Sequence, residues 1–270
     1  MVTQQPDCPA KLDFQVTQQA VKNSTGLSVI IITKNEAFNI RACLESVMWV
    51  DEIIVVDSGS TDETVAICRE FTPHVYVHDW PGFGAQKNRA LNYASKNWVL
   101  SLDADERVTP ELASQIAKAI ADNNKDGFYL PRRSQFCGRF IKHSGWYPDY
   151  VLRLFKRTQG RFSDDMVHER VLLQGAAGKL SSPLLHYSYM DEADVRRKSE
   201  QYASAAALQM FNNGKTVALA DAHIRAGWAF IRTYCLRLGF LDGAAGLNIA
   251  RMNARTTYLK YKKLKMMRSA

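Results

Sequence analysis

The sequence lacks paired cysteines. Its five cysteines lie far apart along the 270 residues, and no two of them form a C-x-x-C pair. They are Cys8, Cys43, Cys68, Cys137 and Cys235. An odd number of isolated thiols argues against both a disulfide framework and a structural zinc site. We therefore expect the protein to work in a reducing compartment.

Long apolar runs are missing as well. The best candidate, residues 226–241, is interrupted by Arg232 and Arg237, whereas a membrane-spanning helix needs about 20 mainly apolar residues. The first 26 residues are polar and contain no apolar core of a secretion signal. We expect them to form a flexible arm, and we expect the chain not to span a membrane.

Acidic residues are absent after Asp242, although the whole chain has a formal net charge of +8. The residues that follow are basic instead: Arg251, Arg255, Lys260, Lys262, Lys263, Lys265 and Arg268. Such an end attracts the phosphates of nucleic acid or of anionic lipid. Alternatively, it is only a solvated helix face.

What the sequence does contain is an alternation of apolar runs and helical segments in its first half. Strands are expected at residues 27–33, 52–57, 75–78, 98–102 and 127–131, with helices between them. This order predicts a parallel sheet with helices on both faces. Asn35 is the expected cap of the first helix, and Thr61 or Asp62 that of the second. Later strands are expected at 150–155 and 180–189, and helices from about residue 191.

Polar residues gather where three of these strands end. Thr33, Asn35 and Glu36 follow the first strand, Asp57 follows the second, and Asp103 and Asp105 follow the fourth. Ligands bind at the carboxyl ends of parallel strands in such sheets. The pattern therefore indicates one cleft.

Asp103 and Asp105 are one residue apart where a buried strand emerges. Two carboxylates there repel each other unless a cation compensates, which favours Mg²⁺ or Mn²⁺. Such an ion would stabilise a diphosphate leaving group. The alternative is that this acidic turn only caps the helix that starts near Pro110.

Three further side chains are candidates for binding the same ligand. Asp57 could accept a hydrogen bond from a nucleobase or a ribose hydroxyl, or simply cap its own loop. Lys87, in a helix entered through a glycine loop, suits a phosphate or base contact, or is merely solvated. Arg153 could meet a diphosphate or an acidic acceptor.

His168-Glu169 is the sharpest later feature. Attack by a hydroxyl needs a base, and the Glu169 carboxylate can serve. Asp164 and Asp165 compete with it for this role. His186 is either a third metal ligand or a strand histidine with an ordinary hydrogen bond.

The chain resembles family 2 glycosyltransferases of the GT-A fold in four motifs: Ser28–Glu36, Val55–Asp62, Gly84–Arg89 and Leu102–Glu106. Three later segments resemble bacterial lipopolysaccharide core glucosyltransferases that place a β-glucose on inner-core heptose. They are Met166–Arg170, Leu185–Ser188 and Gly239–Gly243.

The resemblance implies an α/β fold, a GT-A-type nucleotide-binding sandwich with a mainly parallel central sheet and a helical C-terminal extension. It also implies a UDP-sugar donor, inversion at the anomeric carbon and metal dependence. Nucleotide contacts are implied for Thr33, Glu36, Asp57 and Lys87, a metal contact for Asp105, and a ribose or metal contact for Asp103. The acceptor region lacks the Glu-Asp pair of many members, so His168-Glu169 would replace it. The Gln-x-x-Arg-Trp signature of processive polymerases is absent, which favours a single addition.

We expect three parts: an arm (1–26), a catalytic domain (27–189) and a basic, membrane-proximal helical extension (190–270). The catalytic domain would divide into a nucleotide-sugar half (27–133) and an acceptor half (134–189). A cytoplasmic protein attached peripherally to the inner face of the bacterial inner membrane would meet a lipid-linked acceptor there.

Three other functions are alternatives to this one. The enzyme could act on another cell-surface glycan or lipid-linked acceptor, or be a sugar nucleotidyltransferase, which shares the sheet and the metal pair. Nucleic-acid binding is not expected, because only Tyr258 and Tyr261 lie among the basic residues of the tail and carboxylates line the cleft.

Overall fold

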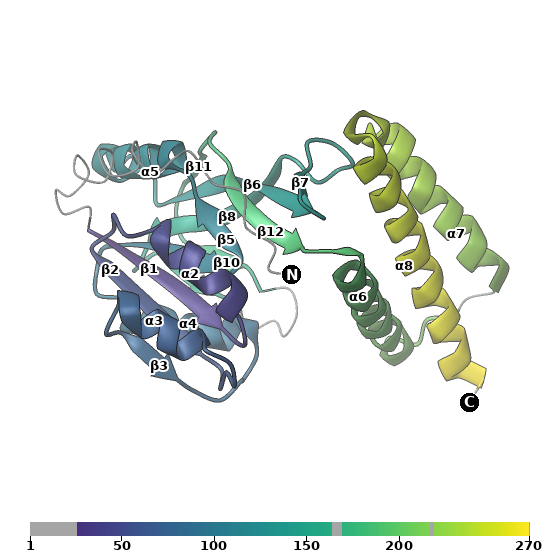
Figure 1. The fold of residues 1–270 in the computed structure, drawn as a ribbon, viewed down its shortest axis with the longest axis horizontal. Coiled ribbons are helices and arrows are strands. Elements are labelled where there is room, and N and C mark those ends of the chain that lie inside the picture. Colours follow the sequence, from purple (N-terminus) through teal and green to yellow (C-terminus); the bar gives the residue numbers. More distant parts are fainter. Residues whose placement is uncertain (1–25, 164–168, 217–218, 270) are drawn as a thin grey trace, which may run out of the picture. The chain divides into compact units, whose positions relative to one another are not determined.

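The structure is a computed structural model that describes residues 26–163, 169–216 and 219–269. The chain forms two compact units (Figure 1). Unit 1 consists of the residues up to Pro131 and of Tyr150–Leu185, and unit 2 consists of Arg132–Asp149 and the residues from His186 onward. The division of the catalytic domain into a nucleotide-sugar half (27–133) and an acceptor half (134–189) remains a prediction. So does the membrane-proximal role of the extension from residue 190.

Unit 1 begins with the parallel strands expected from the sequence. β1 (Leu27–Thr33), β2 (Glu52–Asp57), β3 (Val75–Val77) and β4 (Trp98–Asp103) lie in the order β3-β2-β1-β4. All three neighbouring pairs are parallel. The register places Thr33 beside Asp57 and Ile32 beside Asp103. The polar ends of three strands therefore share one edge of the sheet.

Helices cover both faces of this sheet, because successive side chains of a strand point to opposite faces. Leu27, Val29 and Ile31 of β1 pack into one apolar cluster with α2 (Ala37–Glu45), α3 (Thr64–Phe71) and α5 (Pro110–Asp122). Ile30 packs on the other side with α4 (Phe83–Tyr93). The expected α/β class is confirmed.

The second half of the sheet is mixed. After β4 the strand order continues β8-β6-β12-β5, with β8 antiparallel to β4. These strands are β5 (Glu106–Val108), β6 (Gly127–Phe136), β8 (Asp149–Lys156) and β12 (Leu184–Tyr189). β7 (Arg139–Phe140) and β11 (Ala177–Lys179) pair with β6, whereas β9 (Gly160–Phe162) and β10 (Val171–Leu173) form a separate hairpin.

The helical C-terminal region expected from the sequence belongs to unit 2. It contains α6 (Glu192–Asn212), α7 (Leu219–Ile231), a π-helical turn (Arg232–Leu236), a 3₁₀ turn (Gly239–Asp242) and α8 (Ala244–Ser269). α8 packs against both α6 and α7 (Figure 1). A small core of Phe136, Ile141 and Ile249 joins α8 to the end of β6. No helix among the described residues is both long and apolar enough to cross a membrane.

The helix caps expected at Asn35 and at Thr61 or Asp62 lie one or two residues too early. The cap positions are Glu36 for α2 and Glu63 for α3, and neither side chain makes a capping hydrogen bond. Asn35 has a left-handed backbone (φ 55°), and its side-chain oxygen accepts from the Thr61 N–H at 2.8 Å. Its side chain is therefore used to join the loops after β1 and β2, not to start a helix.

Candidate active site

Asp103, the last residue of β4, is held by two cations. Lys87 Nζ lies 2.9 Å from Asp103 Oδ1, and the Arg153 guanidinium contacts Oδ2. Desolvation by burial opposes ionisation, but the charges of Arg153 and Lys87 outweigh it and hold the pKa of Asp103 far below its ordinary value. Asp103 is therefore a carboxylate at neutral pH.

Glu106 is a member of this cluster that the sequence analysis missed. It is fully buried, its Oε2 accepts from the Asp103 backbone N–H at 3.0 Å, and its Oε1 lies 2.8 Å from Arg153 NH2. Burial alone would lower the pKa of Arg153, but the charges of Asp103 and Glu106 outweigh this effect and hold that pKa above its ordinary value. Buried Glu106 and Val108 alternate with half-buried Arg107 along β5, so the period of two was the signal that pointed Glu106 inward.

The role expected for Arg153, a contact to a diphosphate or an acidic acceptor, is not visible in this state. The side chain is buried between Asp103 and Glu106. Arg153 therefore holds the acidic turn in position, and any substrate contact stays a prediction.

Lys87 joins the acidic turn to the expected base. Its Nζ lies 2.9 Å from Asp103 Oδ1 and 2.8 Å from Glu169 Oε1, and the side chain is only 3% exposed. Lys87 lies on the buried face of α4, which starts after Gly82 in a left-handed conformation (φ 117°). The structure thus brings together three residues that are far apart in the sequence. The competing bases Asp164 and Asp165, and His168, lie outside the described residues.

Asp57 organises the adjacent loop. It is fully buried, its Oδ2 accepts from Thr33 Oγ1 at 2.9 Å, and its Oδ1 accepts from the backbone N–H groups of Gly59 and Ser60 at 2.9 and 2.7 Å. Ser60 Oγ in turn accepts from the Asn35 backbone N–H at 2.8 Å. The loop-capping alternative is therefore realised in this state. Nucleotide contacts of Thr33, Asn35, Glu36, Asp57 and Lys87 remain predictions.

The acidic turn does not cap α5. Thr109 is the N-cap, and its side chain accepts from the Leu112 backbone N–H at 3.2 Å. This removes the alternative in which Asp103 and Asp105 merely start that helix.

The donors available to a divalent cation are few. Asp105 is half-buried one residue beyond Asp103. His186 belongs to unit 2, where its Nδ1 is 2.9 Å from Ser134 Oγ. Among the described residues, no group of three or more His, Cys, Asp or Glu side chains is arranged to hold a metal. Mg²⁺ is commonly held by one or two carboxylates together with substrate phosphates and water. Metal contacts of Asp105, Asp103 and His186 remain predictions.

Comparison with known proteins gives consistent results. Residues 28–180 match the family described as Glycosyl transferase family 2. An uncharacterized glycosyltransferase of Rickettsia felis is 30% identical, covering 88% of this chain and 89% of that protein. The lipopolysaccharide core biosynthesis glycosyltransferase LpsC of Rhizobium meliloti is 29% identical, covering 87% and 93%.

Among solved structures, TarS residues 1–349 of S. aureus in complex with UDP-GlcNAc is 16% identical, with a TM-score of 0.47 and coverage of 90% of this chain and 91% of that one. The family match spans more than half of the chain, and the Rickettsia relative is similar over nearly its whole length. The chain therefore belongs to glycosyl transferase family 2 and is a glycosyltransferase.

Proposed function

We propose that this enzyme is an inverting, non-processive glycosyltransferase that moves glucose from UDP-glucose to a heptose of the lipopolysaccharide inner core. The observation that carries the proposal is the ionic link from Asp103 through Lys87 to Glu169. It joins the donor side of the site to a carboxylate suited to activate an acceptor. The name of LpsC, a lipopolysaccharide core enzyme, supports the acceptor class.

The chemistry is one in-line displacement. The Glu169 carboxylate accepts the proton of the acceptor hydroxyl while that oxygen bonds to the anomeric carbon. The bond from this carbon to the UDP oxygen breaks on the opposite side, which inverts the configuration. Glu169 is ion-paired to Lys87 before substrate enters, so Lys87 is positioned to exchange a carboxylate for a diphosphate oxygen and stabilise the departing UDP.

The residues that would hold Mg²⁺ or Mn²⁺ are Asp105 and Asp103. When bound, the ion supplies positive charge to the diphosphate leaving group. Arg153 and Glu106 fix the direction of Asp103 through the contacts described above. His186 as a further ligand remains part of the proposal.

The test is UDP release from a panel of UDP-glucose, UDP-galactose and UDP-GlcNAc, with heptose-terminated core lipopolysaccharide as acceptor, with and without Mn²⁺. Glu169→Gln is expected to lower turnover by about 10²–10⁴-fold while UDP affinity is retained. The exposed Glu111→Gln is the matched control. Asp105→Asn is expected to abolish stimulation by Mn²⁺.

Three results would count against parts of this proposal. Normal turnover in Glu169→Gln would exclude Glu169 as the base and leave Asp164 and Asp165 as candidates for that role. Faster UDP release from UDP-galactose or UDP-GlcNAc than from UDP-glucose would exclude glucose as the donor sugar. Release of pyrophosphate in place of UDP identifies a nucleotidyltransferase.

The same proposal includes attachment to the inner face of the bacterial inner membrane, through an apolar face of α7. Ile224, Trp228 and Ile231 recur at helical spacing and are 70%, 55% and 48% exposed. Leu236, Phe240 and Leu241 continue the exposed apolar surface after α7. Arg225 and Arg232 are interleaved with them. An apolar face with a tryptophan and flanking arginines is typical of helices that lie in an anionic membrane surface.

Flotation with phosphatidylglycerol vesicles tests this part. The wild type is expected to float, whereas the triple variant Ile224→Ser/Trp228→Ser/Ile231→Ser remains at the bottom. Phe38→Ser, which removes an exposed phenylalanine (78%) from α2 of unit 1, is the control and should float. Equal flotation of wild type and triple variant would rule out this surface.

A further inference from the structure

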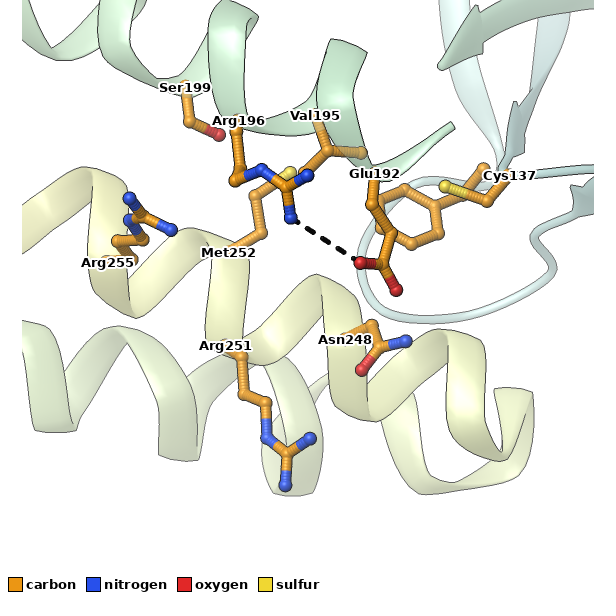
Figure 2. Close-up of a pocket in the computed structure, with 10 residues that line it drawn as sticks. Cys137, Glu192, Val195, Arg196, Ser199, Asn248, Arg251, Met252 and Arg255 are labelled. Carbon is orange, nitrogen blue, oxygen red and sulfur yellow. Dashed lines mark ion pairs between the residues drawn. The ribbon is translucent and has the colours of Figure 1, made fainter. Parts of the chain in front are cut away.

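Unit 2 contains a pocket of about 260 Å³ that the glycosyl transfer chemistry does not use. We call it the α6–α8 pocket, since the two helices supply most of its lining (Figure 2). The lining residues are Phe136, Cys137, Glu192, Val195, Arg196, Ser199, Asn248, Arg251, Met252 and Arg255. All of them belong to unit 2.

Positive charge exceeds negative charge in this lining. Arg196, Arg251 and Arg255 are present, with Glu192 as the one acidic lining residue. Glu192 is 3.5 Å from Arg196 within the same helix. Figure 2 shows Arg196 reaching from α6 toward α8 and Arg255 rising from α8, while the guanidinium of Arg251 points away from α6. After the Arg196–Glu192 pair is counted, the charge of Arg255 remains on the α6 side of α8.

Arg251 and Arg255 are one helical turn apart on α8. Among the described residues, no carboxylate forms an ion pair with either guanidinium. Glu200, whose pKa is lowered mainly by its hydrogen bond with Lys263 and in part by the charge of Arg255, is already paired with Lys263 at 2.6 Å. The pocket is thus short of an anion.

The floor of the pocket is apolar and firmly built. Phe136 is 5% exposed and belongs to the small core of unit 2, against which Val195 and Met252 pack. Ser199 and Asn248 add a hydroxyl and an amide beside the arginines. Arginine is the side chain best suited to bind the oxygens of a phosphate through paired hydrogen bonds. An apolar floor with polar side groups suits the face of a sugar ring.

We propose that the α6–α8 pocket binds a phosphorylated sugar, with Arg196 and Arg255 contacting the phosphate. A volume below the 300–1,000 Å³ of drug-sized sites limits the ligand to about one phosphorylated monosaccharide unit. The assignment of this unit to the acceptor rests on the proposed function. The glycosyltransferase would then recognise its acceptor by a phosphate located away from the reacting hydroxyl.

Cys137 provides a local measurement of binding. It lines the pocket and is exposed, and Cys235, exposed elsewhere in unit 2, serves as an internal reference. Glucose 6-phosphate is expected to slow alkylation of Cys137 by iodoacetamide, resolved at the peptide level, without changing that of Cys235. Unphosphorylated glucose at the same concentration should have no effect.

Two variants test the arginines. In Arg196→Gln/Arg255→Gln the concentration of glucose 6-phosphate that protects Cys137 should rise about tenfold or more, as expected for lost charge-assisted hydrogen bonds. Arg197→Gln is the matched control, because Arg197 is on the same helix but outside the pocket and its partner Asp194 keeps Lys198. Its protection should stay within about twofold of the wild type.

A kinetic measurement connects the pocket to the acceptor. The double variant should raise KM for a phosphorylated core acceptor and leave KM unchanged for the same acceptor after phosphatase treatment, with unchanged UDP affinity. If the wild type releases no UDP with any acceptor, the proposed function fails while protection of Cys137 still holds. Protection by glucose equal to that by glucose 6-phosphate, no protection by either, or equal protection by phosphatidylglycerol vesicles overturns the pocket proposal.

Discussion

The positive charges of Lys87 and Arg153 stabilise the acidic turn inside unit 1. The two cations contact three carboxylates, those of Asp103, Glu106 and Glu169. Buried carboxylates without compensating charge would destabilise the fold or become protonated. By formal charge, three carboxylates against two cations leave the cluster with one negative charge in excess, which favours the approach of a further cation.

Glu106 is the residue of this cluster with the least freedom. In Glu106→Gln the amide offers one oxygen for two donors, and its NH₂ group must face either the Asp103 N–H or Arg153. We expect the free energy of unfolding to fall by about 2–4 kcal/mol. Urea denaturation measures this loss. The same substitution at exposed Glu111 should change it by less than about 0.5 kcal/mol, and equal effects at both positions would show that the cluster does not stabilise the fold.

Cys68 illustrates a residue whose environment suppresses its chemistry. Burial in the core, aided by the charge of Asp57, raises its pKa to about 12. An unfolded thiol has a pKa of about 8.5, so the neutral form is favoured in the folded state. Stability gained in this way is fully present below about pH 8.5 and is lost as the pH rises toward 12.

The measurable consequence is slow alkylation. At pH 8 iodoacetamide should modify the exposed Cys137 and Cys235 at least about 100-fold faster than Cys68 and the buried Cys43. Peptide mass spectrometry over a time course measures the rates. Comparable rates at all four sites in the native protein would disprove this view of the core.

At the scale of elements, the first half of the chain was predictable because each strand is a short apolar run bounded by polar residues. β1, β2 and β4 have nearly the expected bounds, and their parallel pairing follows from the intervening helices. The register that places Thr33 beside Asp57 was not visible as a pattern, but parallel alignment of strand ends led to the same edge.

The remaining sheet was harder to predict because its pairing is not local. β12 pairs with β6 and β5, whose sequence positions are far from it and from each other. The strand expected at residues 127–131 continues to Phe136. Its extension was not predicted, because Arg132, Arg133 and Gln135 are polar and interrupt the apolar run. The period of two in β5 pointed Glu106 inward, but its cationic partner Arg153 lies far away in the sequence and meets it only in the folded chain.

Two glycines of the helical region offer a matched pair of substitutions. A Cβ on Gly246 would lie 1.8 Å from the Gly239 backbone oxygen, whereas a Cβ on Gly227 meets nothing within 4 Å. Gly246→Ala must therefore separate α8 from the 3₁₀ turn, and we expect it to destabilise the protein by about 3 kcal/mol or more. Gly227→Ala, inside α7, should stabilise it by about 0.5–1 kcal/mol.

Thermal unfolding followed by circular dichroism at 222 nm distinguishes the two variants. A lowered Tm for Gly246→Ala and a raised one for Gly227→Ala are expected. A Gly246→Ala protein with the wild-type Tm would mean that α8 does not approach the 3₁₀ turn at this point.

For the whole molecule, carboxylates with lowered pKa occur in both units. They are Glu52, Asp62, Glu70, Asp103 and Asp126 in unit 1, and Asp194 and Glu200 in unit 2. Burial opposes the shift at several of them, but hydrogen bonds and nearby cations outweigh it. Both units therefore depend on ionised carboxylates, and their response to acid should be shared.

The sign of that response follows from proton binding. A carboxylate with a lowered folded-state pKa stabilises the fold above its unfolded pKa of about 4, and this stability is lost as the pH falls, because the unfolded chain then binds more protons. The urea midpoint should therefore stay nearly constant from pH 8 to about 5 and decline below that. Repeating the series in 0.5 M NaCl screens the general repulsion of a chain that is already basic at neutral pH. A decline that persists in salt identifies the paired carboxylates as its cause, whereas a midpoint independent of pH down to 3.5 in salt would show that these pairs contribute nothing to stability.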